Sequence, residues 1–123
     1  MPWHTILLED LPVIETRYSG VLTPAELSSA AREIFDLIRE HNRTFLLADC
    51  TALGGGHSIV DLYALAETLA SGNLVPNLKE AVLLPSLPDS VENVKFWETA
   101  CINRGIRVRI FCNRQSALDW LMT

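Results

Sequence analysis

The segment from Asp49 to Ser58 gathers most of the side chains in this sequence that could do chemistry. An acid and a thiol, Asp49 and Cys50, precede three consecutive glycines, and His57 and Ser58 follow them. A serine, a histidine and an acid can form a nucleophile with its base, whereas glycine amides before a helix can bind an anion. The segment therefore suggests a hydrolase site, an anion-binding loop or a plain helix start.

The motifs that would specify the first two possibilities are incomplete. Ser58 does not lie in a GxSxG sequence, and the glycines have neither the spacing nor the lysine of a nucleotide-binding loop. His4 and His41 have no partners at metal-ligand spacing, so we expect no metal or other cofactor. We expect the chain not to be an enzyme and keep three glycines as a candidate ligand loop: Gly54, Gly55 and Gly56.

Ser58 is explained by a structural role alone, as the N-cap of the helix that follows it. Asp61 follows it by three residues, so the two side chains can bond to each other's amides in a capping box. A serine cap stabilises a helix by ~1 kcal/mol. Cys50 follows a buried strand, where thiols are usually inert packing. The cap alone accounts for Ser58, and a modification there would be an additional property.

Composition and charge restrict the class of protein. The 123 residues are 49% hydrophobic and 20% charged, which indicates a single globular domain over residues 1–123. The three cysteines are widely spaced and predict reduced thiols in the cytoplasm. We expect no signal peptide and no membrane span, since no apolar run approaches ~18 residues. A net charge of −5 argues against nucleic-acid binding.

Basic residues are concentrated near the end of the sequence. Residues 93–123 carry five basic and two acidic groups. Arg104, Arg107 and Arg109 could meet an acidic protein partner, although arginines that alternate along a strand are more simply a solvated edge. The sequence does not identify such a partner, and a homodimer is expected only from the general frequency of dimers.

Hydrophobic periodicity and capping residues predict the elements that must position these residues. The strands are predicted at residues 5–9, 13–20, 44–50, 80–85 and 106–111. The helices are predicted to begin at the caps Thr23, Ser58, Asp89 and Asn113, with ends near Asn42, Gly72 and Gly105. The order β-β-α-β-α-β-α-β-α predicts an α/β domain, with a single-layer mixed, mostly parallel sheet of five strands flanked by four helices.

This order of elements and the stretch LADCTALGGGHSIVDLY resemble the STAS domain. That family contains the anti-sigma-factor antagonists and the cytosolic domains of sulfate transporters, and its members carry Asp-Ser-Ser/Thr-Gly-Leu at a helix start. In the bacterial antagonists a serine of this motif is phosphorylated, and Ser58 falls on that position. His57 stands where the family has an acid, and no glycine follows the serine. The chain also resembles a divergent STAS group related to lipid-binding SEC14-like domains.

The resemblance implies a cytoplasmic regulatory module that acts through protein–protein contacts. A switch would lie at the helix start around Ser58, with His57 and Asp49 beside it. The alternative implied by the divergent relatives is a small-molecule or lipid-binding domain, with a pocket near the loop of residues 50–58.

Overall fold

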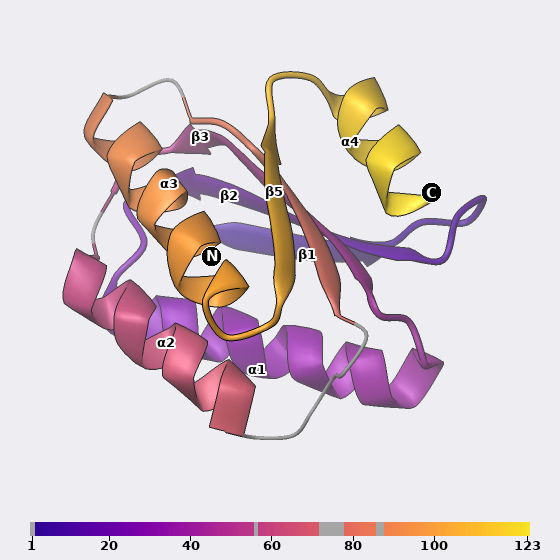
Figure 1. Ribbon diagram of the computed structural model, residues 1–123, viewed down its shortest axis with the longest axis horizontal. Coiled ribbons are helices and arrows are strands. Elements are labelled where there is room, and N and C mark those ends of the chain that lie inside the picture. The colour runs from indigo at the N-terminus through magenta and orange to yellow at the C-terminus, as the bar shows by residue number, and fades with distance from the viewer. Residues whose placement is uncertain (1, 56, 72–77, 86–87) are drawn as a thin grey trace.

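The computed structural model describes residues 2–55, 57–71, 78–85 and 88–123. Within these residues a single five-stranded sheet is flanked by four helices, as the sequence predicts (Figure 1). The elements are β1 (Trp3–Leu7), β2 (Val13–Gly20), α1 (Pro24–His41), β3 (Phe45–Leu53), α2 (Ile59–Ser71), β4 (Lys79–Leu83), α3 (Pro88–Ile102), β5 (Arg107–Phe111) and α4 (Arg114–Leu121).

The strands lie in the sheet in the same order as in the sequence, β1-β2-β3-β4-β5. β1 runs antiparallel to β2, and all other neighbours are parallel. Because parallel crossovers are right-handed and every step goes in the same direction, α1, α2 and α3 must cover the same face. Figure 1 shows these three helices on one side of the sheet and α4 on the other.

The helix starts at Thr23 and Asn113 agree with the sequence. Thr23 and Glu26 form the reciprocal capping box, with the Glu26 amide 3.2 Å from the Thr23 hydroxyl oxygen and the Thr23 amide 3.0 Å from the Glu26 carboxylate. α1 ends before Asn42, which adopts φ 53°. Asn113 accepts a 2.8 Å hydrogen bond from the Ser116 amide at the start of α4.

Other boundaries differ from the predicted ones. β3 continues to Leu53, three residues past the predicted end, because its last residues pair with the end of β2 beyond a register shift. β1 begins at Trp3 rather than Thr5 and ends at Leu7. α3 runs from Pro88, so the helix already includes Asp89, where the sequence predicts the cap. The predicted helix end at Gly72 lies outside the described residues.

The strands bury side chains on both faces, which produces two cores. Beneath α1, α2 and α3 lies the larger core, to which Ile14, Ala48, Val82 and Val108 contribute. The smaller core lies beneath α4 and is formed by Val13, Leu47, Ala81, Leu83, Ala117 and Leu121. Lys79, only 4% exposed, directs its ammonium group to the Trp120 carbonyl at the end of α4 and holds this helix on the sheet.

Candidate functional site

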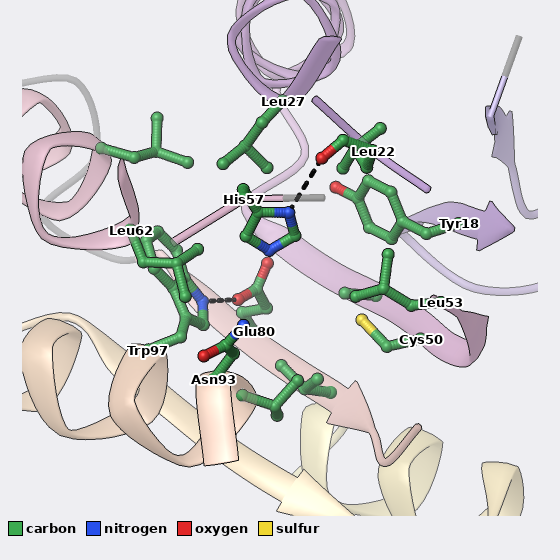
Figure 2. A pocket seen from close by; sticks show the side chains of 14 residues that line it. Tyr18, Leu22, Leu27, Cys50, Leu53, His57, Leu62, Glu80, Asn93 and Trp97 are labelled. Atoms are coloured by element: carbon green, nitrogen blue, oxygen red, sulfur yellow. Dashed lines mark hydrogen bonds between the residues drawn. The ribbon is translucent and has the colours of Figure 1, made fainter. Parts of the chain in front are cut away.

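A cavity of about 80 Å³ lies between the sheet and the three helices that cover the same face (Figure 2). A second cavity of about 50 Å³ adjoins it. The first cavity is lined by Tyr18, Leu22, Leu27, Ala48, Cys50, Leu53, His57, Leu62, Leu65, Glu80, Val82, Asn93, Val94 and Trp97.

Glu80 is the acidic side chain that both cavities share. Its position on β4 points it toward the helices, beside Val82 on the same face. The Trp97 indole N–H donates a 2.7 Å hydrogen bond to Glu80 Oε1. Burial raises the pKa of Glu80 to about 7, because the single indole hydrogen bond lowers it by less than desolvation raises it. Near neutral pH this carboxyl group therefore exchanges between its charged and neutral forms.

Two other polar groups that line the cavity are neutral at ordinary pH. Burial raises the pKa of the Tyr18 hydroxyl, and the nearby charge of Glu80 adds to the effect. Burial likewise raises the pKa of the Cys50 thiol, so Cys50 is not a thiolate. These groups can donate hydrogen bonds to a bound molecule, and Cys50 is unsuited to act as a nucleophile.

His57 enters the cavity from the loop between β3 and α2. Its Nδ1 lies 3.1 Å from the Leu22 carbonyl oxygen, so the tautomer with a proton on Nδ1 donates to that carbonyl. Figure 2 shows the imidazole of His57 and the carboxyl group of Glu80 directed into the same space. The loop of His57 thus contributes one wall of the cavity.

The glycines before His57 hold this loop against the end of β2. The Gly54 amide donates to the Gly20 carbonyl at 2.7 Å, and the Leu22 amide donates to the Gly55 carbonyl at 2.8 Å. A side chain at residue 54 would meet the Gly20 backbone at 3.3 Å, which explains the need for glycine there. Gly56 lies outside the described residues. The Gly54 amide and the Gly55 carbonyl are already hydrogen-bonded to the end of β2 and the residues that follow it. An anion that bound the Gly54 amide would have to break its hydrogen bond to Gly20.

Ser58 forms the predicted helix cap and lies at the surface. The Asp61 amide donates to Ser58 Oγ at 3.3 Å, while the Ser58 amide and hydroxyl donate to Asp61 Oδ2 at 2.7 and 2.9 Å. These hydrogen bonds, that of the amide first, lower the pKa of Asp61. Ser58 does not line the described cavity, although it directly follows His57, which does.

Asp49 lies on the opposite face of the sheet from the cavity. Its neighbours along β3, Ala48 and Cys50, line the cavity, so the alternation of side chains directs Asp49 toward the α4 side. Its carboxylate accepts hydrogen bonds from the Thr51 amide at 3.1 Å and the Thr51 hydroxyl at 2.6 Å. The structure therefore does not bring Asp49 together with His57 and Ser58.

The three arginines of the predicted partner patch lie on two sides of the molecule. Arg104 packs over the Tyr63 ring, 4.6 Å from its centroid, and pairs with Glu67 of α2 at 3.5 Å. Arg107 and Arg109 point to the α4 side of β5, because Val108 between them is buried in the core of the other face. These arginines do not form one continuous patch.

A fully buried carboxyl group, Glu15, lies on the α4 side of the sheet. It is 0% exposed and pairs with Arg17 Nε at 2.8 Å and with an Arg114 terminal nitrogen at 2.6 Å. Burial by itself would raise its pKa, but the hydrogen bonds and charges of Arg114 and Arg17 outweigh that effect and lower it. Glu15 is thus a structural carboxylate with both arginines as partners.

Sequence reasoning did not identify Glu80, Tyr18, Trp97 or Asn93 as site residues. A usable signal was present at Glu80, because an acid in a strand predicted to be buried on both faces must be paired, protonated or functional. Tyr18 and Trp97 carried no such signal, since aromatic residues on the inner side of a strand or helix are ordinary core residues.

Comparisons with known proteins establish the fold. No family model and no curated protein matches this sequence. Among solved structures, the chain is similar to an uncharacterised protein of the DUF3478 family with a SpoIIAA-like fold from Shewanella loihica. The likeness covers 97% of this chain and 91% of that chain, with a TM-score of 0.59 and 19% identity. This chain has a SpoIIAA-like fold, which confirms the resemblance to the STAS domain at the level of architecture.

The described residues supply neither a membrane helix nor a metal centre. None of their helices is both long and apolar enough to cross a bilayer. In the same part of the chain, no three histidine, cysteine, aspartate or glutamate side chains gather where they could hold a metal ion.

Proposed function

We propose that this protein is a non-enzymatic binding module that holds a small, largely apolar molecule in the cavity beneath α1, α2 and α3. The observation that carries the proposal is an apolar cavity whose walls enclose one poorly solvated carboxyl group, Glu80. Ligand sites are typically apolar hollows with a few convergent polar groups of perturbed pKa. A poorly solvated carboxyl group whose described side-chain partner is one indole N–H is costly in a core that merely needs packing.

Two side chains that could have acted as nucleophiles support the non-enzymatic part of the proposal. The Cys50 thiol is neutral because burial raises its pKa. The Ser58 hydroxyl is bonded to Asp61 and lies outside the cavity, and Nδ1 of His57 faces the Leu22 carbonyl. This arrangement differs from the nucleophile–base–acid geometry that a hydrolase requires.

An NMR titration with benzyl alcohol tests the proposal. We expect saturable shifts at residues that line the cavity, including the Trp97 indole. Ala48→Leu, which fills the first cavity, should abolish them, whereas Ala25→Leu on the exposed side of α1 should not. Because Ala48 lies in a central strand, Ala31→Leu serves as a second filling variant in the adjoining cavity. Shifts scattered over the surface, or unchanged in the folded filled variants, would contradict a ligand cavity.

We also propose a partner-binding role for the surface around Ser58, which a separate observation supports. Ile59, Val60 and Tyr63 are exposed apolar residues within the first two turns of α2, directly after Ser58, and Val60 is 74% exposed. Exposed apolar groups of this kind mark protein contacts. A phosphate on Ser58 would remove the hydroxyl donor and place negative charge beside the Asp61 carboxylate. The start of α2, and with it His57 and the cavity wall, would then shift.

Phosphorylation of Ser58 is testable by intact mass. The protein is incubated with ATP and a lysate of its host, and we expect one added phosphate in the wild type and none in Ser58→Ala. Ser28→Ala, which removes an exposed serine from α1, is the matched control and should still gain the phosphate. An unmodified wild-type protein, or modification that persists in Ser58→Ala, would contradict a switch at Ser58.

A further inference from the structure

We infer that the molecule held in the cavity is a small amine, with its ammonium group against Glu80 and its hydrocarbon part in the adjoining apolar spaces. The inference rests on the proposed ligand-binding function and names the class of ligand. It follows from the charge, the aromatic side chains and the size of the cavity.

The charged groups of the cavity favour a cation and disfavour an anion. Among the described residues that line the two spaces, Glu80 is the one carboxylic acid, and none is a lysine or an arginine. A carboxylate or phosphate ligand would face Glu80 with no lysine or arginine among the described lining residues to pair with it. An ammonium group would instead neutralise Glu80, and pairing is the condition under which poorly solvated charges are tolerated.

The aromatic side chains beside Glu80 favour the same class of ligand. Tyr18 and Trp97 line both cavities together with Glu80, and Figure 2 shows them on either side of it. Ammonium groups are attracted to aromatic rings, most strongly where water is excluded. Because the Trp97 indole N–H already donates to Glu80 Oε1, the carboxylate is held in place for a second donor. A neutral alcohol could also donate to it but would leave its charge uncompensated.

The volumes limit the size of the ligand. The two spaces of about 80 and 50 Å³ together approach the ~150 Å³ at which an engineered apolar cavity holds benzene. The hydrocarbon part is therefore about one aromatic ring, or an aliphatic chain of similar volume. A two-chain lipid does not fit within these spaces.

Binding also links the ligand to the protonation of Glu80. At pH 6 the free carboxyl group is mostly protonated, so an ammonium ligand must displace its proton to solvent, whereas at pH 8 it is already charged. Four titratable groups face Glu80 from the surrounding elements: Tyr18, Cys50, His57 and Cys101. The tyrosine and both thiols are neutral between pH 6 and pH 8, because burial raises their pKa values. The affinity for an amine should therefore be about tenfold lower at pH 6 than at pH 8.

Three probes of the same size separate the ligand classes: benzylamine, benzyl alcohol and benzoate, titrated at pH 8 and followed by calorimetry and NMR. We expect benzylamine to bind at least tenfold more tightly than benzyl alcohol, and benzoate to bind most weakly. Glu80→Gln keeps an acceptor for Trp97 and should remove the preference for the amine while leaving benzyl alcohol binding within about twofold. Glu92→Gln, on the exposed side of α3, is the matched control and should keep the preference.

The outcomes distinguish this inference from the proposed function. If none of the three probes binds in the cavity, the proposed function fails. If benzyl alcohol or benzoate binds as tightly as benzylamine, or the preference persists in Glu80→Gln, the amine is wrong although the cavity still binds ligands. His57→Gln removes the other titratable group beside Glu80. If the tenfold change in amine affinity between pH 6 and pH 8 disappears in this variant, the pH dependence belongs to His57 and the inference about Glu80 is wrong.

Discussion

Glu15 and Glu80 are both glutamates on inner strands of the same sheet, yet they occupy opposite electrostatic environments. Glu15 faces α4 and pairs with two arginines, and its pKa is lowered. Glu80 faces the three other helices, receives one indole hydrogen bond, and has a pKa raised to about 7. The difference depends on their partners, because burial by itself would raise both pKa values.

This contrast separates a structural carboxylate from one that is poised for a ligand. A paired carboxylate such as Glu15 has its charge compensated within the fold. Glu80 has no arginine beside it among the described lining residues; it faces the cavity together with His57, and a ligand in that cavity could supply a cationic partner. Sheet geometry alone does not make this distinction, since alternation along a strand decides only which face a side chain occupies.

The largest expected effect is the dependence of stability on pH through Glu80. Its pKa is raised in the folded state, so the stability that it contributes is present at pH 4.5 and is lost as the pH rises through 7. We expect its contribution to the free energy of unfolding to fall by about 3 kcal/mol over this range. Urea denaturation at several pH values should show the slope in the wild type and in Glu92→Gln but not in Glu80→Gln. A wild-type slope that survives in Glu80→Gln would assign it to another group.

Removing a partner of Glu15 should have the next largest effect. Arg114→Met leaves a fully buried carboxylate with Arg17 alone, and we expect a loss of about 2 kcal/mol at pH 7. Arg109→Met is the matched control, because Arg109 lies on the same side of the sheet and contacts the Phe111 ring. It should cost no more than about 0.5 kcal/mol. Equal losses in the two variants would mean that Arg114 matters only as part of the general surface charge.

Two tryptophans donate an indole hydrogen bond to a glutamate: Trp97 to Glu80 and Trp3 to Glu33. Replacing each tryptophan with phenylalanine removes one of these bonds. Trp97→Phe should cost about 1.5 kcal/mol more at pH 8 than at pH 5, because the bond is strongest to the charged form of Glu80. The pKa of Glu80 should rise above 7 in this variant. Trp3→Phe removes an exposed indole bond to Glu33 and should show the same cost at both pH values. If the two variants depended on pH alike, the special state of Glu80 would be refuted.

The smallest expected effect is a pH-dependent NMR shift, which reports the ionisation of Glu80 directly and so tests how it differs from Glu15. The Trp97 indole resonance should shift with a midpoint near pH 7, as its acceptor Glu80 ionises, while the Trp3 and Trp120 resonances should not. Asn93→Lys places a cation at the cavity and should move the midpoint downward by at least one unit, toward the behaviour of Glu15. A midpoint unaffected by Asn93→Lys would show that the ammonium group does not reach Glu80.

The order of the elements and the starts of α1, α2 and α4 were accessible from the sequence, because the signals are local. Thr23 with Glu26 and Ser58 with Asp61 lie three residues apart, and both pairs form the predicted bonds. The end of β3 was not accessible, since it depends on pairing with β2 across a register shift. The resemblance places Asp49 beside a switch at Ser58, but the strand alternation directs Asp49 to the opposite face.

The sequence by itself determined the fold class, the order of the elements and the cap at Ser58. Each of these follows from periodicity or from residues within one helical turn of each other. Only the tertiary structure decided that Glu80 meets Trp97 and Tyr18 at a cavity, and that Glu15 meets Arg114 across the other face. The physical reason is that a carboxyl group's state depends on charges and solvent around it in space, which come from segments far apart in the chain.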